Sequence, residues 1–291
     1  MNDTPNDTKD QHETGGSSAS PAEPPRTSLL EVEDVVKRFG GIRAVNGATL
    51  NVRGGQITAL IGPNGAGKTT LFNVLTGFYK GDQGSVRLDG QEILGERPYR
   101  IARKGMVRTF QITKALAAMP VINNMMLAAP NQPGERLRDV VFRPRAAKAR
   151  ENEVRKQAME LLALFNLTEL ADSYAGTLSG GQRKLLELAR ALMAEPKLLM
   201  LDEPMAGINP TLGRRLLDYM QNLRRELGVT IVFIEHDMEV VMNHSDTVVV
   251  MAEGRVIAEG EPRDVRRDKR VIDAYLGEVG EETTAPGGAP E

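Results

Sequence analysis

The sequence contains a glycine-rich stretch, GPNGAGKTT, between an apolar run and an amphipathic run. It fits the pattern G-x-x-x-x-G-K-[S/T], in which backbone N–H groups of the loop wrap the phosphates of a nucleotide. Lys68 would meet the β- and γ-phosphates, and the Thr69 hydroxyl would bind Mg²⁺. A glycine-rich turn that only caps a helix is the alternative, and the strand, loop and helix context disfavours it. The predicted nucleotide-binding residues are Gly62, Pro63, Asn64, Gly65, Ala66, Gly67, Lys68, Thr69 and Thr70.

Two adjacent carboxylates, Asp202 and Glu203, follow the apolar run LLML. Open α/β sheets bind ligands at the carboxyl ends of their strands, so a buried strand here would deliver both side chains to such a site. Asp202 is predicted to hold Mg²⁺, directly or through water, and Glu203 to polarise the water that attacks the γ-phosphate. Taken alone, Asp-Glu-Pro fits a polar strand end better. The P-loop in the same chain is what favours catalysis.

His236 follows another apolar run, VFIE. A lone histidine at a strand end is more often structural than functional. Here a further strand end is expected to point at the same crevice, so His236 is predicted to sense the γ-phosphate or to stabilise the transition state. The chain lacks an N-K-x-D guanine-reading motif, which disfavours GTPases and nucleotide kinases.

A second glycine-rich stretch, LSGGQ, begins an amphipathic run far downstream of the first. Ser179 and Gln182 have the spacing of a capping box at a helix start. A cap does not explain the two glycines Gly180 and Gly181, because each lowers helix stability by up to about 1 kcal/mol relative to alanine. A closely approaching ligand would explain them. Since one nucleotide does not need two helix starts on the same side, this one is expected to close on a nucleotide held by another subunit.

The pattern of the chain predicts an α/β fold that positions these groups. Residues 29–94 alternate short β-like runs with glycine-containing turns, which indicates an antiparallel β subdomain. Residues from about 98 to 176 have helical periodicity and form a predicted helical insert. After Ser179, helices alternate with apolar strands, as in a P-loop NTPase core. One domain is therefore expected over residues 29–277.

The two ends, residues 1–28 and 278–291, contain almost nothing that can be buried and are predicted to be disordered tails. The chain has 39 acidic and 37 basic residues in total, and the two ends are acidic, so the body between them is mildly basic. This excess of basic residues is too small to indicate a nucleic-acid partner. The absence of cysteine excludes disulfides and thiolate metal sites and suits a reducing cytosol. No signal peptide and no membrane-spanning run of about 18 apolar residues is expected.

The ordered set GPNGAGKTT, Gln111, LSGGQ, LLMLDEP and His236 resembles the ATP-binding subunits of ABC transporters, across nearly all of residues 29–277. In that family two subunits enclose two ATP molecules, each held by the P-loop of one chain and the LSGGQ segment of the other. The resemblance implies an ABC ATPase fold with ATP and Mg²⁺ as cofactors. It further implies that Gln111 links Mg²⁺ and the γ-phosphate to the helical subdomain, and that Phe39, otherwise expected in the core, stacks on adenine. It implies contacts to ATP in trans from Ser179, Gly180, Gly181 and Gln182.

Shorter stretches resemble one branch of the family, the high-affinity branched-chain amino-acid uptake ATPases. These are Arg108–Gln111, the loop MAGINP and the ending Ala274–Gly277. Importers of urea or amides and exporters of lipopolysaccharide share much of the layout and stay open as alternatives. In MAGINP, Asn209 replaces the aspartate common in the family, so the role of this loop between subunits is open.

The resemblance also implies partners and a location. The expected partners are transmembrane permease subunits, a second ATP-binding subunit that is a related chain or a second copy, and indirectly a solute-binding protein. The expected location is peripheral, at the cytoplasmic face of the plasma membrane. The methionine-rich residues 112–130 are predicted to contact the permease. A soluble ABC ATPase acting on DNA or ribosomes is the rival, which the lack of long heptad repeats and of a second cassette disfavours, and no nucleic-acid partner is expected.

Overall fold

The computed structural model describes residues 28–109, 116–130 and 144–281. Gln111 lies outside the described residues, as do residues 112–115 of the predicted permease contact and most of the two predicted tails. The first strand begins at Ser28 and the last helix ends at Glu281. Regular structure thus reaches slightly beyond the predicted limits at both ends. The sequence did not indicate this, because the polar composition of these residues resembles that of the tails.

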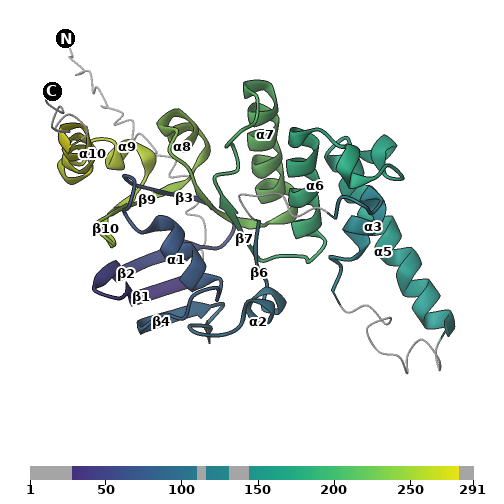
Figure 1. Cartoon of the computed structure of the whole chain (residues 1–291), viewed down its shortest axis with the longest axis horizontal. Coiled ribbons are helices and arrows are strands. Elements are labelled where there is room, and N and C mark those ends of the chain that lie inside the picture. The colour runs from purple at the N-terminus through teal and green to yellow at the C-terminus, as the bar shows by residue number, and fades with distance from the viewer. Residues whose placement is uncertain (1–27, 110–115, 131–143, 282–291) are drawn as a thin grey trace, which may run out of the picture.

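Within the described residues, a six-stranded sheet runs through the core (Figure 1). Its strands are β3 (Ile57–Ile61), β6 (Met106–Arg108), β7 (Leu198–Asp202), β8 (Thr230–Ile234), β9 (Thr247–Ala252) and β10 (Arg255–Gly260). They follow the order β10-β9-β3-β8-β7-β6 and are parallel, apart from β10, which is antiparallel to β9. Every residue of β3, β7 and β8 is buried, as expected for parallel strands that are covered on both faces.

Helices pack on this sheet and extend from one of its edges (Figure 1). They are α1 (Lys68–Leu75), α2 (Pro98–Arg103), α3 (Val121–Met126), α5 (Pro144–Leu164), α6 (Gly180–Leu192), α7 (Pro210–Leu227), α8 (Met238–His244), α9 (Pro262–Val265) and α10 (Lys269–Glu281). In the part of the chain that the structure describes, no helix is both long and apolar enough to cross a membrane.

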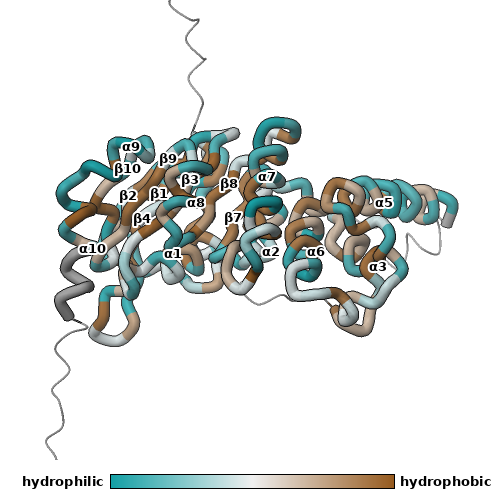
Figure 2. Tube along the Cα trace, turned by 90° about the horizontal axis from the view of Figure 1, so that it is seen from above, coloured by the Kyte–Doolittle hydropathy of each residue, from teal (hydrophilic) through white to brown (hydrophobic). Residues whose placement is uncertain are grey.

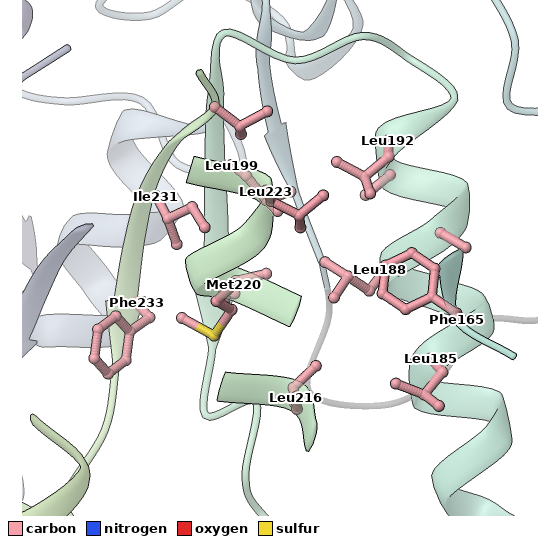
Figure 3. Packing of buried hydrophobic residues seen from close by; sticks show 14 of the residues in the cluster. Phe165, Leu185, Leu188, Leu192, Leu199, Leu216, Met220, Leu223, Ile231 and Phe233 are labelled. Atoms are coloured by element: carbon pink, nitrogen blue, oxygen red, sulfur yellow. The ribbon is translucent and has the colours of Figure 1, made fainter. Parts of the chain in front are cut away.

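Alternate residues of the strands pack on opposite faces of the sheet. Leu199 and Ile231 belong to a hydrophobic cluster that includes residues of α6 and α7 (Figure 3). Their strand neighbours Met200 and Val232 belong to a second cluster with Phe72 of α1. This period of two is the geometry of a β-strand, and it divides the core into two layers, one on each face of the sheet. Figure 2 shows the hydrophobic residues gathered along the strands of the core.

A four-stranded antiparallel sheet covers the layer that contains α1. Its strands are β1 (Ser28–Phe39), β2 (Ile42–Arg53), β4 (Gln83–Leu88) and β5 (Gln91–Glu92), in the order β2-β1-β4-β5. Buried valines and leucines of β1, β2 and β4 belong to the same cluster as Phe72. The predicted α/β fold class with an antiparallel β subdomain is thus what the structure has.

Helices α3, α5 and α6 pack on one another beyond the β6 edge of the central sheet (Figure 1). Residues 106–108, which lie within the predicted helical insert from about 98 to 176, form β6 and pair with β7 in the central sheet. Three residues are too few to display a strand period, so β6 could not be found by pattern. The helical part begins after β6 and shares α6 with the core.

The methionine-rich segment contributes to the core more than was predicted. Met125 is fully buried in the cluster that α3 shares with α6, and Met126 packs against the same cluster. Leu116 and Leu127 are exposed instead, at 46% and 55%. Met125 is therefore excluded as a surface contact, and the exposed leucines carry the apolar surface of this segment.

Candidate nucleotide-binding site

The P-loop connects the end of β3 to the first residue of α1, so β3, loop and helix follow one another as the motif requires. Gly62 and Gly67 have φ values of 147° and 96°, where glycine is favoured. A Cβ at Gly62 would lie 2.0 Å from the carbonyl oxygen of Met251, and one at Gly67 would lie 2.2 Å from that of Ala44. These two glycines are therefore required by close packing of the loop against other backbone. Gly65, by contrast, faces open space.

Lys68 lies along its own loop. Its Nζ donates to the carbonyl oxygens of Gly62 at 2.7 Å and of Pro63 at 2.8 Å. Asn64 and Thr69 are exposed on the open side of the loop and of α1. The first turn of α1 contains no acidic residue, so the lysine charge and the N–H groups of the helix start make this end of the loop positive, as a phosphate site requires.

The sheet topology brings the other predicted catalytic residues to the same edge. Gly62 follows β3, His236 follows β8 after one residue, and Asp202 and Glu203 lie at the end of β7. These three parallel strands are adjacent, in the order β3-β8-β7. The carboxyl ends of neighbouring parallel strands form the ligand crevice of open α/β sheets. P-loop, carboxylates and histidine therefore lie at the same edge of the sheet.

Asp202 is buried and paired with Arg108, which lies in the stretch that resembles one branch of the family and for which no role in the site was predicted. Its Oδ2 accepts a hydrogen bond from Nη2 of Arg108 at 2.6 Å, and the two side chains are 5% and 8% exposed. The other arm of the guanidinium, Nη1, donates to Oδ1 of Asn73 on α1 at 2.6 Å. Arg108 thus connects the carboxylate at the end of β7 to the helix that follows the P-loop, and its hydrogen bond is to Oδ2 of Asp202.

Glu203 begins the turn that leaves β7. Its φ of 47° lies in the left-handed region, which non-glycine residues seldom adopt. The Glu203 N–H donates to the Ile234 carbonyl at 3.1 Å, and the Glu203 carbonyl accepts from the Ala206 N–H at 3.1 Å. Such backbone persists where the surroundings hold it, and it clusters at functional sites. The half-buried Glu203 side chain is therefore aimed by a constrained turn.

A second glutamate, Glu235, lies beside His236 and was not singled out by the motifs. Glu235 is 1% exposed, and its Oε1 accepts from the Met205 N–H at 2.8 Å. Burial raises the pKa of Glu235, and the nearby charge of Glu203 adds to this, while hydrogen bonds from the N–H groups of Met205 and His236 act in the opposite direction. The His236 side chain is 75% exposed, with Nδ1 3.7 Å from Oε2 of Glu235. Glu235 thus anchors the loop after Glu203 and lies under the histidine.

The LSGGQ segment forms the predicted cap. Ser179 Oγ accepts from the Gln182 N–H at 3.2 Å, and Gln182 Oε1 accepts from the Ser179 N–H at 2.9 Å. A Cβ at Gly181 would lie 2.1 Å from Cδ2 of Leu212 on α7, whereas Gly180 has nothing within 4 Å. The close approach of Leu212 thus gives Gly181 a second explanation, and its predicted contact with ATP stays a prediction. Only Gly180 presents an open surface.

Replacing Gly180 with alanine is expected to leave the stability of the chain unchanged or to raise it by up to about 1 kcal/mol, the helix preference of alanine. Alanine at Gly181 is expected to be about 1 kcal/mol less favourable than alanine at Gly180, the low end of the cost of overpacking, because the end of the Leu212 side chain must rotate away from the added methyl group. Urea unfolding of both variants measures the difference. Equal midpoints for the two variants would contradict the packing explanation.

The LSGGQ helix start opens onto a different cavity from the P-loop. This cavity of about 360 Å³ is lined by Ser179 and Gln182 together with Asn209, Leu212 and other residues from the start of α7. Asn209 caps α7, accepting from the Leu212 N–H at 2.9 Å. The asparagine that replaces the usual aspartate therefore still performs a capping role, and it lies beside the LSGGQ segment.

Phe39 lies at the end of β1 and is 44% exposed, which excludes the alternative that it is a core residue. Its ring packs edge-on against the ring of Tyr79, with the two ring centroids 5.2 Å apart, and Lys37 Nζ lies 5.3 Å from the centroid of the Phe39 ring. Tyr79, 40% exposed, is a second aromatic side chain here that the motifs did not indicate. The two rings form an exposed aromatic corner next to the antiparallel sheet.

A parallel sheet with a P-loop after β3, paired carboxylates after β7 and a histidine after β8 defines a P-loop nucleoside triphosphatase. The family comparison is more specific. Residues 45–206 match the family model described as ABC transporter, and residues 255–281 match the model described as branched-chain amino acid ATP-binding cassette transporter. The chain belongs to the ABC transporter ATP-binding cassette family, and it is an ATP-binding ATPase of that family.

Named relatives support this membership. The chain is 46% identical to the high-affinity branched-chain amino acid transport ATP-binding protein BraF of Pseudomonas aeruginosa, over 86% of this chain and 98% of that protein. It is 42% identical to a probable branched-chain amino acid transport ATP-binding protein, LivG, of Archaeoglobus fulgidus, over 86% and 95%. The fold is also similar to a crystal structure of the ADP conformation of the ATP-binding cassette MJ1267, with a TM-score of 0.72. The two sequences are 36% identical, and the match covers 86% of this chain and 99% of that chain.

Proposed function

We propose that this chain is the ATP-binding subunit of an importer for branched-chain amino acids. The observation that carries the proposal is the similarity to BraF across 98% of that protein, together with the branched-chain model at residues 255–281. The expected assembly contains permease subunits and a second ATP-binding subunit, either a related chain or another copy, and it receives solute from a solute-binding protein. The chain would be peripheral, at the cytoplasmic face of the plasma membrane.

The residues at the strand ends fit ATP and Mg²⁺. Lys68 and the N–H groups at the start of α1 supply the positive surroundings that phosphates need, and Phe39 offers an exposed ring for the adenine. The Thr69 hydroxyl and the carboxylate of Asp202 are the hard oxygen donors that Mg²⁺ prefers. Bound Mg²⁺ would neutralise charge on the phosphates. Gln111, outside the described residues, stays a predicted ligand from the family resemblance.

Glu203 and His236 would perform the chemistry at the γ-phosphate. Glu203 is the half-buried carboxylate of the crevice and would accept a proton from the attacking water. The exposed imidazole of His236 can donate a hydrogen bond to the phosphoryl oxygens. The buried Glu235 is unsuited to be the base, because both of its oxygens accept backbone N–H groups.

The LSGGQ segment would complete the site of a second subunit. Gly180 is open and the capped helix start provides N–H groups, yet the cavity beside it contains no P-loop residue among its lining residues. A composite site at a dimer interface is consistent with both observations. Binding of ATP would then close the dimer, hydrolysis would open it, and the helical part would transmit the motion to the permease.

Uptake of radiolabelled leucine, isoleucine and valine tests this function. A strain deleted for the gene is expected to lose high-affinity uptake of all three, and the wild-type chain should restore it, whereas a Lys68→Ala variant should not. Lys156→Ala is the matched control, since Lys156 is 80% exposed on α5. Normal uptake in the deletion strain, combined with a defect in urea or amide uptake or in lipopolysaccharide export, would identify one of the alternative transporters.

A further inference from the structure

The loop that follows Glu203 is held from two sides. On one side, Glu235 at the end of β8 accepts from the Met205 N–H. On the other side, Lys184 of α6 donates through its Nζ to the carbonyl oxygen of Pro204 at 3.2 Å and to that of Ala206. The carbonyl groups of residues 204 and 206 are thus held by a lysine of α6, and the N–H group of Met205 is held by a glutamate that follows β8. We call these contacts the loop clamp.

The ammonium group of Lys184 loses part of its hydration in this position. A lysine near the surface ordinarily extends its ammonium into water. Here the side chain turns inward, and burial lowers the pKa of Lys184, while the charges of Glu235, Glu187 and Glu203 act in the opposite direction. The two carbonyl oxygens and the neighbouring carboxylates replace the lost water. The arrangement selects one geometry of the lysine and of the turn that it contacts.

The loop clamp joins the two functional segments of the chain. Lys184 lies on the helix that Ser179 caps, within the turn that follows LSGGQ. Ala206, whose carbonyl oxygen accepts from Lys184, donates its own N–H to the carbonyl of Glu203. The unusual φ of Glu203 depends on such external support. A displacement of α6 would therefore shift the turn from which the Glu203 side chain projects.

We propose that Lys184 is a positioning residue for Glu203, connecting the LSGGQ helix to the attacking-water site of the same chain. The inference rests on the proposed function, in which Glu203 is the general base. In this role Lys184 acts through the backbone of the loop. Its effect is to hold the carbonyl groups of residues 204 and 206, and through them the direction of the catalytic carboxylate.

Steady-state ATPase kinetics of the assembled transporter that contains the full-length chain test the role of Lys184. In Lys184→Met, kcat is expected to fall about 10- to 100-fold, the range that a displacement of about 1 Å can produce, with KM for ATP within about twofold of wild type. Lys184→Arg should recover part of kcat, because it keeps the charge and the donors. Lys156→Met, on the exposed face of α5, is the control. Lys184→Gln provides the same comparison should the methionine variant not fold.

A double-mutant cycle distinguishes positioning from general damage. If Lys184 acts through Glu203, Lys184→Met should cause no further loss in a Glu203→Gln background, because the group being positioned is already gone. An equal-fold loss in both backgrounds, or an unchanged kcat in the single variant, overturns the proposal. An assembled wild-type transporter without any ATPase activity overturns the proposed function itself. Normal wild-type activity with an unchanged Lys184→Met variant removes only the role of Lys184.

Discussion

Replacing Arg108 with methionine is expected to lower the free energy of unfolding by about 3–5 kcal/mol, the range found when one partner of a buried ion pair is removed. The substitution leaves the 5%-exposed Asp202 carboxylate without its 2.6 Å partner. It also removes the link to Asn73 on α1, so the strand that ends in the carboxylates and the helix after the P-loop lose a direct connection. The midpoint of urea unfolding measures the change.

Two further variants define the origin of this effect. Adding Asp202→Asn to Arg108→Met removes the unpaired charge and should recover part of the stability. Arg87→Met is the matched surface control, because Arg87 is 43% exposed and 3.9 Å from Glu33, and exposed pairs contribute about 0–1 kcal/mol. An Arg108→Met variant with the urea midpoint of the control would show that the pair does not stabilise the fold.

Local patterns predicted much of this molecule. The P-loop, the capping box of Ser179 and the strand that ends at Asp202 each depend on residues that are near in sequence, so spacing and periodicity reveal them. The family resemblance was confirmed by the matches to ABC transporter models and relatives. The α/β fold class follows from the same features, because apolar strands that alternate with helices form parallel sheets.

The residues that were missed have partners that are distant in sequence. Arg108 pairs with a carboxylate 94 residues away, and Glu235 accepts from an N–H group 30 residues away. Lys184 reaches a carbonyl 22 residues along the chain. No periodicity encodes such pairs, since each depends on how strands and helices come together. The same reason explains Gly181, whose neighbour Leu212 lies on another helix.

Glu203→Gln is expected to lower kcat for ATP hydrolysis by about 10²- to 10⁴-fold, the contribution of a positioned general base. Glutamine has nearly the same shape, so the turn at φ 47° and its backbone hydrogen bonds should be kept. An amide, however, accepts no proton from the attacking water. Because Lys68, Thr69 and Asp202 are unchanged, the affinity for ATP should stay within about twofold, and dimers closed on ATP should accumulate, visible by size-exclusion chromatography.

Two isosteric controls decide which carboxylate is the base. Glu160→Gln, on an exposed side chain of α5, should leave kcat unchanged. Glu235→Gln should reduce kcat far less than Glu203→Gln, because the amide oxygen can still accept from the Met205 N–H, and the variant loses only the longer hydrogen bond from the His236 N–H. If Glu203→Gln kept wild-type kcat while Glu235→Gln lost it, proton transfer would belong to the buried glutamate, and Glu203 would be only the constrained end of its strand.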